Sequence, residues 1–249
     1  MSVTIEPLEC GWLTAAAESF EEGAGDEPLR IPIAVWLVRH PRGELVFDTG
    51  LHPELAVSTD RIGGLAKVFT ADMAPERSLG ARLRAADVDP DRLRCVVLSH
   101  LHFDHAGGLC EVPNAEVVVQ SAEWDAGRAD DAKRFGYRAA DYDLGHGLRL
   151  VDGDHDVFGD GAVTCLATPG HTAGHQSLRV VTDDGPVVLT ADACYFAHTL
   201  DRGVLPPFAH DHDTQRRSLQ RLVDERAGGA RVLAGHDPVQ FAALPARLG

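Results

Sequence analysis

Short apolar runs alternate with turn residues along most of this chain. The runs predict strands at 31–38, 44–47, 95–98, 116–119, 148–151, 162–166, 177–182, 186–190 and 231–234. Helical spacing of leucines and alanines predicts one helix over 78–87 and another after Asp213, which we expect to be its N-cap. Ser121 is the expected N-cap of a further helix after the fourth strand.

Residues 51–77 show no clear period, although they contain the pair Gly63-Gly64 and several apolar side chains. One interpretation is a loop with a short helix that folds onto the core. The other is a lid over an apolar part of a substrate. The pattern leaves both open.

Polar side chains that can ligate a metal ion follow the apolar run 95–98. Three histidines and an aspartate occupy His100, His102, Asp104 and His105. Imidazole and carboxylate groups suit zinc, and burying four of them without a metal would leave polar groups unpaired. Histidines on neighbouring backbone positions cannot all reach one ion, so the spacing favours two ions that share the loop.

Other predicted strands also end in metal-ligating residue types. His171, Asp192 and His236 follow the runs 162–166, 186–190 and 231–234. Residues after strands tend to gather at one edge of a sheet, so we expect seven ligand-type side chains to converge there. Asp48 follows the run 44–47 and either orients a ligating imidazole or caps the following turn.

Composition narrows the class of protein. The chain has 249 residues with 44% hydrophobic content, which is enough for one domain over 1–249. A net charge of −15 disfavours nucleic-acid binding, and no apolar run approaches the roughly 20 residues of a membrane span. Five widely spaced cysteines without a Cys-x-x-Cys pair, and no signal-peptide pattern, predict a cytoplasmic protein.

Several motifs together resemble the metallo-β-lactamase fold superfamily, and among its branches the N-acyl-homoserine lactonases. They are His-Leu-His-Phe-Asp-His-Ala-Gly-Gly at 100–108, Thr-Pro-Gly-His at 168–171, Gly-His-Gln-Ser-Leu at 174–178 and Gly-His-Asp at 235–237, with Phe-Asp-Thr-Gly at 47–50. The resemblance implies an α/β (α+β) fold. Its form is a four-layer αββα sandwich of two mixed β-sheets with helices outside and metals at one edge.

The resemblance also implies a ligand set for two Zn²⁺ ions, although other divalent metals are possible. One ion would be held by His100, His102 and His171, the other by Asp104, His105 and His236, and Asp192 would bridge them. The β-lactamases of this fold lack that bridging aspartate, and the di-iron branch carries a glutamate where this chain has His102. His175 would lie outside the ligand shell. His210–Asp213 are expected to form a solvated helix cap rather than a third metal site.

The implied activity is hydrolysis of the lactone ring of N-acyl-homoserine lactones, the reaction known as quorum quenching. Two ions can lower the pKa of a shared water towards ~7, so that hydroxide attacks the ester carbonyl. Tyr195 would contact that carbonyl, Asp104 would carry a proton to the leaving alkoxide, and Phe69 and Phe103 would join Tyr195 in substrate binding. We expect a small-molecule substrate, no nucleic-acid or membrane partner, and a monomer or homodimer.

Three alternatives remain at this stage. A lactonase for another ring, such as 4-pyridoxolactone, shares nearly the same motifs. A glyoxalase-II-like thioesterase uses similar ligands, but it usually carries a further helical region, and only 13 residues follow His236 here. A metal-binding sensor without catalysis is the non-enzymatic alternative. No Gly-x-Ser-x-Gly motif is present, which disfavours a serine hydrolase.

Overall fold

Two mixed β-sheets form the centre of the computed structural model, which describes residues 2–249. The seven-stranded sheet has the order β4-β1-β2-β3-β5-β6-β7, and the five-stranded sheet has the order β12-β11-β10-β9-β8. The first sheet comprises β1 (Thr4–Ala16), β2 (Pro28–His40), β3 (Gly43–Phe47), β4 (Thr70–Asp72), β5 (Cys95–Val97), β6 (Glu116–Gln120) and β7 (Leu148–Val151). The second comprises β8 (His155–Asp156), β9 (Val163–Ala167), β10 (Gln176–Thr182), β11 (Gly185–Leu189) and β12 (Arg231–Leu233).

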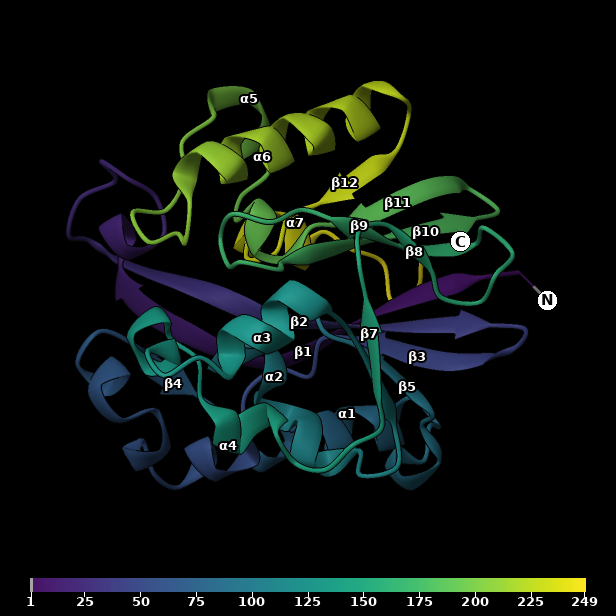
Figure 1. Cartoon of the computed structure of the whole chain (residues 1–249), viewed down its shortest axis with the longest axis horizontal. Coiled ribbons are helices and arrows are strands. Elements are labelled where there is room, and N and C mark those ends of the chain that lie inside the picture. The colour runs from purple at the N-terminus through teal and green to yellow at the C-terminus, as the bar shows by residue number, and fades with distance from the viewer. Residues whose placement is uncertain (1) are drawn as a thin grey trace.

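The chain forms seven α-helices among the described residues, of which α1 and α6 cover the outer faces of the two sheets. They are α1 (Leu79–Ala85), α2 (Phe103–Ala106), α3 (Ser121–Gly127), α4 (Ala139–Tyr142), α5 (Thr199–Arg202), α6 (His212–Ala227) and α7 (Pro238–Ala242). Figure 1 shows α6 on the side of the five-stranded sheet and α1, α3 and α4 on the opposite side of the molecule. The predicted αββα sandwich of two mixed sheets is therefore confirmed.

The strands at the centre of the first sheet are apolar on both faces. Val96, Val117 and Val119 pack outward with Leu79 and Leu83 of α1. Their neighbours Val97 and Val118 point the other way, into a core shared with β9, β10 and β11 of the second sheet. Because successive residues of a strand alternate between faces, a continuous apolar run is what a sheet buried on both sides requires.

The five-stranded sheet is likewise covered on its outer face, where Val188 of β11 and Val232 of β12 pack against Leu219 and Leu222 of α6. The C-terminal segment returns to the first strand, since Leu248 forms an isolated β-bridge with Ile5 of β1. Figure 1 accordingly places the beginning of β1 and the C-terminus at the same end of the molecule. Within residues 2–249, no helix combines the length and apolar character that crossing a membrane demands.

The longest strands differ from the sequence prediction. The apolar pattern does not predict β1, because a β-bulge between Glu9 and Trp12 interrupts the alternation and Gly11 adopts a φ of 114°. The N-cap predictions were also wrong by one or two residues. Gln120 rather than Ser121 precedes α3, and Asp211 rather than Asp213 caps α6 by accepting a hydrogen bond from Thr214 N.

Residues 51–77 contain no α-helix. They form three 3₁₀ turns, at Pro53–Ala56, Asp60–Lys67 and Pro75–Arg77, together with the short edge strand β4. Gly63 breaks the second turn with a φ of 54° and a ψ of −123°. The helical turns of this segment are thus 3₁₀ rather than α-helical, and they pack onto the core through Leu55 and Ile62, as the first interpretation expects.

Candidate metal centre

Four strand ends bring seven ligand-type side chains to one edge of the sandwich. His100, His102, Asp104 and His105 follow β5, and the chain then turns through Gly107 and Gly108. His171 follows β9, Asp192 follows β11 and His236 follows β12. A Cβ on Gly108 would lie 2.2 Å from the carbonyl oxygen of Thr49, so this close approach of two loops requires glycine.

A first ligand group consists of His100, His102 and His171. The Nδ1 atom of His102 lies 3.0 Å from His100 Nε2 and 3.2 Å from His171 Nε2. Asp192 joins this group, because its Oδ2 lies 3.2 Å from His171 Nε2. The four ligand atoms lie within 4.8 Å of one another, and all four side chains are buried.

A second ligand group consists of Asp104, His105 and His236. Asp192 faces this group with its other oxygen, since Oδ1 lies 3.0 Å from His105 Nε2 and 2.9 Å from His236 Nε2. Asp104 Oδ2 lies 3.6 Å from His105 Nε2. One carboxylate thus stands between two groups, which is the position of a bridging ligand.

The hydrogen bonds on the far side of three rings fix which nitrogen carries a proton. His102 Nε2 donates to the carbonyl of Phe135, and His236 Nδ1 donates to the carbonyl of Pro32. His105 Nδ1 donates to the carboxylate of Asp48. In the neutral rings the opposite nitrogens are bare lone pairs, and they point at other acceptors. Lone pairs that face one another in this way repel. A pair of cations between them would remove the repulsion, because each lone pair could then coordinate a metal ion.

The buried acidic and imidazole groups of the cluster shift one another's pKa values in opposite directions. Burial opposes protonation of His105, but the carboxylates of Asp192, Asp104 and Asp48 outweigh it and raise its pKa well above the usual value. Burial and the neighbouring histidines lower the pKa of His100 well below it. Burial alone would raise the pKa of Asp192, yet the adjacent imidazoles hold it well below its usual range. Asp192 is therefore a carboxylate anion, and imidazoles of both ligand groups stabilise its negative charge.

Two further side chains named from the sequence lie just outside the ligands. Asp48, in a left-handed conformation with φ 65°, also accepts from Ser99 N at 2.7 Å and from Ser99 Oγ at 2.9 Å. His175 Nε2 accepts a hydrogen bond from the backbone N–H of Asp192 at 3.1 Å. Asp48 thus holds a ligand ring, and His175 holds the backbone of the central carboxylate.

Aromatic side chains lie next to the two ligand groups. The ring centroid of Tyr195 lies 5.0 Å from that of His236 and 5.9 Å from that of His171. Phe103 lies beside Phe69, at 6.1 Å between centroids. Burial and the nearby carboxylates of Asp192 and Asp104 raise the pKa of Tyr195 well above its usual value, so its hydroxyl stays protonated.

Sequence reasoning did not single out two other aromatic residues at this edge. Phe20 packs between Phe69 and Tyr195, with centroid distances of 6.0 and 6.5 Å. Phe208 is 42% exposed, and its ring lies 5.9 Å from those of both His102 and His171. Both residues lie in connecting segments that carry no motif at a strand end. The sequence therefore offers only an aromatic residue in a loop as a sign of their position.

The remaining His/Asp-rich stretch is a helix cap. Asp211 accepts hydrogen bonds from Thr214 N and Thr214 Oγ1, each at 3.0 Å, and His212 Nε2 bonds to the carbonyl of Pro207. Its main chain nevertheless supports the metal edge, because His210 N donates to the carbonyl of His171.

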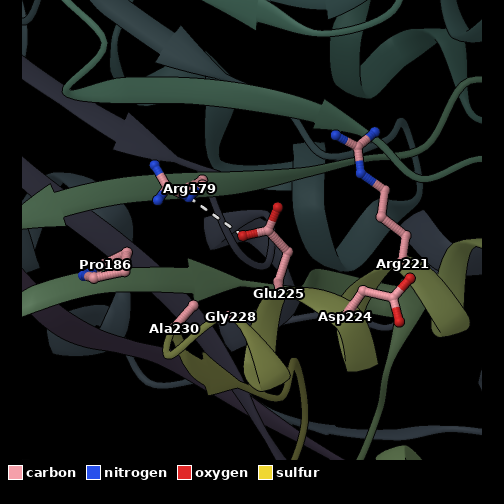
Figure 2. Close-up of a pocket in the computed structure, with 7 residues that line it drawn as sticks. All are labelled: Arg179, Pro186, Arg221, Asp224, Glu225, Gly228 and Ala230. Atoms are coloured by element: carbon pink, nitrogen blue, oxygen red, sulfur yellow. Dashed lines mark hydrogen bonds and ion pairs between the residues drawn. The ribbon is translucent and has the colours of Figure 1, made fainter.

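A separate surface pocket lies on the outer side of the five-stranded sheet, next to α6. Figure 2 shows its lining, Arg179, Pro186, Arg221, Asp224, Glu225, Gly228 and Ala230, around a volume of about 330 Å³. Its arginines already have partners, since Arg179 Nε lies 3.3 Å from Glu225 Oε2 and Arg221 Nη1 lies 2.8 Å from Asp154 Oδ1. Both arginines of this pocket are therefore already paired with acidic side chains of the protein.

Comparison with known proteins places these features in context. Residues 30–236 match the model of the metallo-beta-lactamase superfamily. N-acyl homoserine lactonase AttM of Azorhizobium caulinodans is 35% identical over 243 residues, covering 93% of this chain and 92% of the relative. N-acyl homoserine lactonase AiiA of Bacillus thuringiensis subsp. kurstaki is 33% identical, covering 84% of this chain and 82% of the relative.

The fold has a similarly clear match among solved structures. An N-acyl homoserine lactone hydrolase, solved with the product N-hexanoyl-L-homoserine bound at its catalytic metal centre, superimposes with a TM-score of 0.89. The match covers 98% of each chain at 26% sequence identity.

Proposed function

Because this chain belongs to the metallo-beta-lactamase superfamily and, within it, to the N-acyl homoserine lactonases, we propose that it opens the lactone ring of N-acyl-homoserine lactones by hydrolysis. The reaction class is hydrolysis of an ester bond, and quorum quenching is its consequence. The observation that carries the proposal is the carboxylate of Asp192, which presents one oxygen to each of two buried ligand groups. That geometry serves a pair of metal ions.

The ligand assignment follows the two groups. His100, His102 and His171 hold the first cation, Asp104, His105 and His236 hold the second, and Asp192 bridges them. We propose Zn²⁺ in both positions, because five imidazoles and two carboxylates suit this borderline ion, and other divalent metals could replace it. When bound, the two ions supply an activated water and a positive charge next to the scissile carbonyl.

The side chains around the ions perform the other tasks. The neutral hydroxyl of Tyr195 donates a hydrogen bond to the carbonyl oxygen, where negative charge develops as the ring opens. Asp104, at the edge of the second group, carries a proton to the alkoxide that leaves. The aromatic wall of Phe20, Phe69 and Phe103 contacts the acyl chain and keeps water away from the ester.

We further propose that residues 1–249 act as one domain in the cytoplasm, as a monomer or homodimer. All five cysteines are free thiols, and Cys110 is exposed, which is the pattern of a protein kept under reducing conditions. The partner is a small-molecule lactone.

A hydrolysis panel on the purified, zinc-loaded protein tests the function. The panel compares short- and long-chain N-acyl-homoserine lactones, 4-pyridoxolactone and a glutathione thioester, and we expect the highest kcat/KM for an N-acyl-homoserine lactone. Faster hydrolysis of 4-pyridoxolactone or of the thioester would replace the proposed substrate.

Asp192→Asn is the matched variant in the same assay. It keeps the size of the side chain but removes the charge that both ligand groups share. We expect it to lose bound zinc and to lose turnover. A metal-depleted Asp192→Asn protein that hydrolysed the lactone at the parent rate would refute the metal-dependent mechanism.

A further inference from the structure

A buried carboxylate lies behind the first ligand group without belonging to it. Glu123, in the first turn of α3, is fully buried and is not among the seven ligands. Burial raises the pKa of its carboxyl group. A buried acid is costly unless hydrogen bonds compensate it, so its partners indicate why it is there.

Each oxygen of Glu123 accepts a hydrogen bond from a different loop. Oε1 accepts from the backbone N–H of Leu101 at 3.0 Å, and Oε2 accepts from the backbone N–H of Gly174 at 2.9 Å. Leu101 stands between His100 and His102, while Gly174 lies in the turn that begins at His171. One carboxylate therefore joins the two loops that supply all three histidines of the first group.

These loops come from different sheets. The Leu101 loop follows β5 of the seven-stranded sheet, and the Gly174 turn follows β9 of the five-stranded sheet. At their base, Gln176 N donates to the carbonyl of Ser99 at 2.9 Å. Glu123 adds a second connection, made within the segments that carry the ligands.

The contact is tight enough to restrict the sequence at position 174. A Cβ on Gly174 would lie 2.2 Å from the backbone nitrogen of Glu123, a distance that no side chain tolerates. The backbone donors of Leu101 and Gly174 are buried and need an acceptor. Gly174 therefore packs against the backbone of Glu123 and donates its N–H to the carboxylate of the same residue.

We propose that Glu123 is a positioning residue for the first metal position, one that holds His100 and His102 in register with His171 through the backbones of their two loops. The inference rests on the proposed two-metal function. The second group, Asp104, His105 and His236, makes no hydrogen bond to Glu123 among the described residues. Loss of Glu123 therefore weakens one metal position more than the other.

The test is the near-isosteric variant Glu123→Gln. Its carboxamide keeps one acceptor oxygen, but its NH₂ group faces a backbone N–H, so one of the two hydrogen bonds is lost. Zinc release from the loaded protein is followed by titration with a chelator, which needs no substrate. We expect the affinity of the protein for one of the two zinc ions to fall by ~10- to 100-fold. The affinity for the other ion should change little.

Glu111→Gln is the matched control. Glu111 also bridges two donors, accepting from Ser78 Oγ and from Gly80 N at 3.0 Å each, but it anchors α1 instead of a ligand loop. We expect Glu111→Gln to lower Tm while both zinc affinities stay unchanged. Unchanged release from Glu123→Gln, or equal weakening of both ions, would overturn the proposal.

Amide hydrogen exchange on the unmodified protein covers the case in which Glu123→Gln does not fold. The amides of Leu101 and Gly174 are expected to stay protected after zinc is removed, because their acceptor is a side chain of the protein. Rapid exchange of both amides in the metal-free protein would contradict the proposed role. Since neither measurement involves lactone, either result is independent of whether the substrate assignment holds.

Discussion

The hydroxyl of Tyr195 differs from its neighbours because its role can be separated from metal binding. Its ring packs against His171 and His236, but the phenol is not a member of either ligand group. Burial next to Asp192 keeps the hydroxyl protonated. At the residue scale, the proposal therefore assigns Tyr195 to substrate activation and the surrounding imidazoles to metal binding.

Tyr195→Phe tests that separation. The variant removes one hydrogen-bond donor to the developing oxyanion, so we expect kcat to fall by up to ~100-fold. Zinc content, measured on the same sample, should stay at the parent value. Unchanged kinetics would make Tyr195 a packing residue only, and loss of zinc would make it part of the metal shell.

At the scale of elements, the segment 51–77 is tied to α4 by one side chain. Arg61 reaches Asp141 through Nε at 3.0 Å and Nη2 at 2.7 Å, and Nη2 also donates to the carbonyl of Ala140. Asp141 is only 2% exposed, and Arg61 is the nearer of its two cationic neighbours, since Arg138 Nε lies 3.8 Å away. The same segment carries Phe69 to the aromatic wall. Arg61 thus links the fixed helix layer to the segment that the sequence leaves open as a lid.

Arg61→Ala is expected to loosen the segment. Removing the guanidinium takes away both short hydrogen bonds to the buried Asp141 and leaves it only the more distant Arg138 Nε at 3.8 Å. We expect this loss to cost about 1–3 kcal/mol of stability. We expect faster thermolysin cleavage between residues 51 and 77 and a higher KM for long-chain lactones. Lys67→Ala, an exposed change in the same segment, is the control and should alter neither quantity. Equal KM values for Arg61→Ala and the parent would argue against a lid.

At the scale of the whole molecule, the proposed metal pair joins the two sheets. One ligand loop follows the seven-stranded sheet, and His171, Asp192 and His236 follow three strands of the five-stranded sheet. Ions bound there stabilise the packing of the sheets as well as the site, because they bind the folded state and not the unfolded chain.

Metal removal should therefore lower the Tm of the entire domain. Free zinc at about 100 times Kd contributes about 2.7 kcal/mol, which corresponds to roughly 5–10 °C for a chain of this size. Differential scanning calorimetry with and without chelator measures the shift. Asp192→Asn should show a much smaller response to chelator. If the Tm of the parent protein were the same with and without chelator, the cations would not contribute to the packing of the two sheets.

The sequence alone determined the features that depend on local order along the chain. Apolar runs predict most of the strands, and the motif from His100 to His105 predicts a metal edge, because strand period and ligand spacing are properties of neighbouring residues. The bulged strand β1 and the turns around Gly63 break that local period, which is why the pattern missed them.

Only the tertiary structure decided how distant residues meet. That Asp192 offers one oxygen to His105 and the other to His171 depends on how the two sheets pack, as does the position of Phe208 over His102. In the sequence, Glu123 is an ordinary residue at the start of a predicted helix. Its two hydrogen bonds form only because α3 packs beneath both ligand loops. Spacing along the chain encodes each loop, whereas the packing of the layers sets the distances between them.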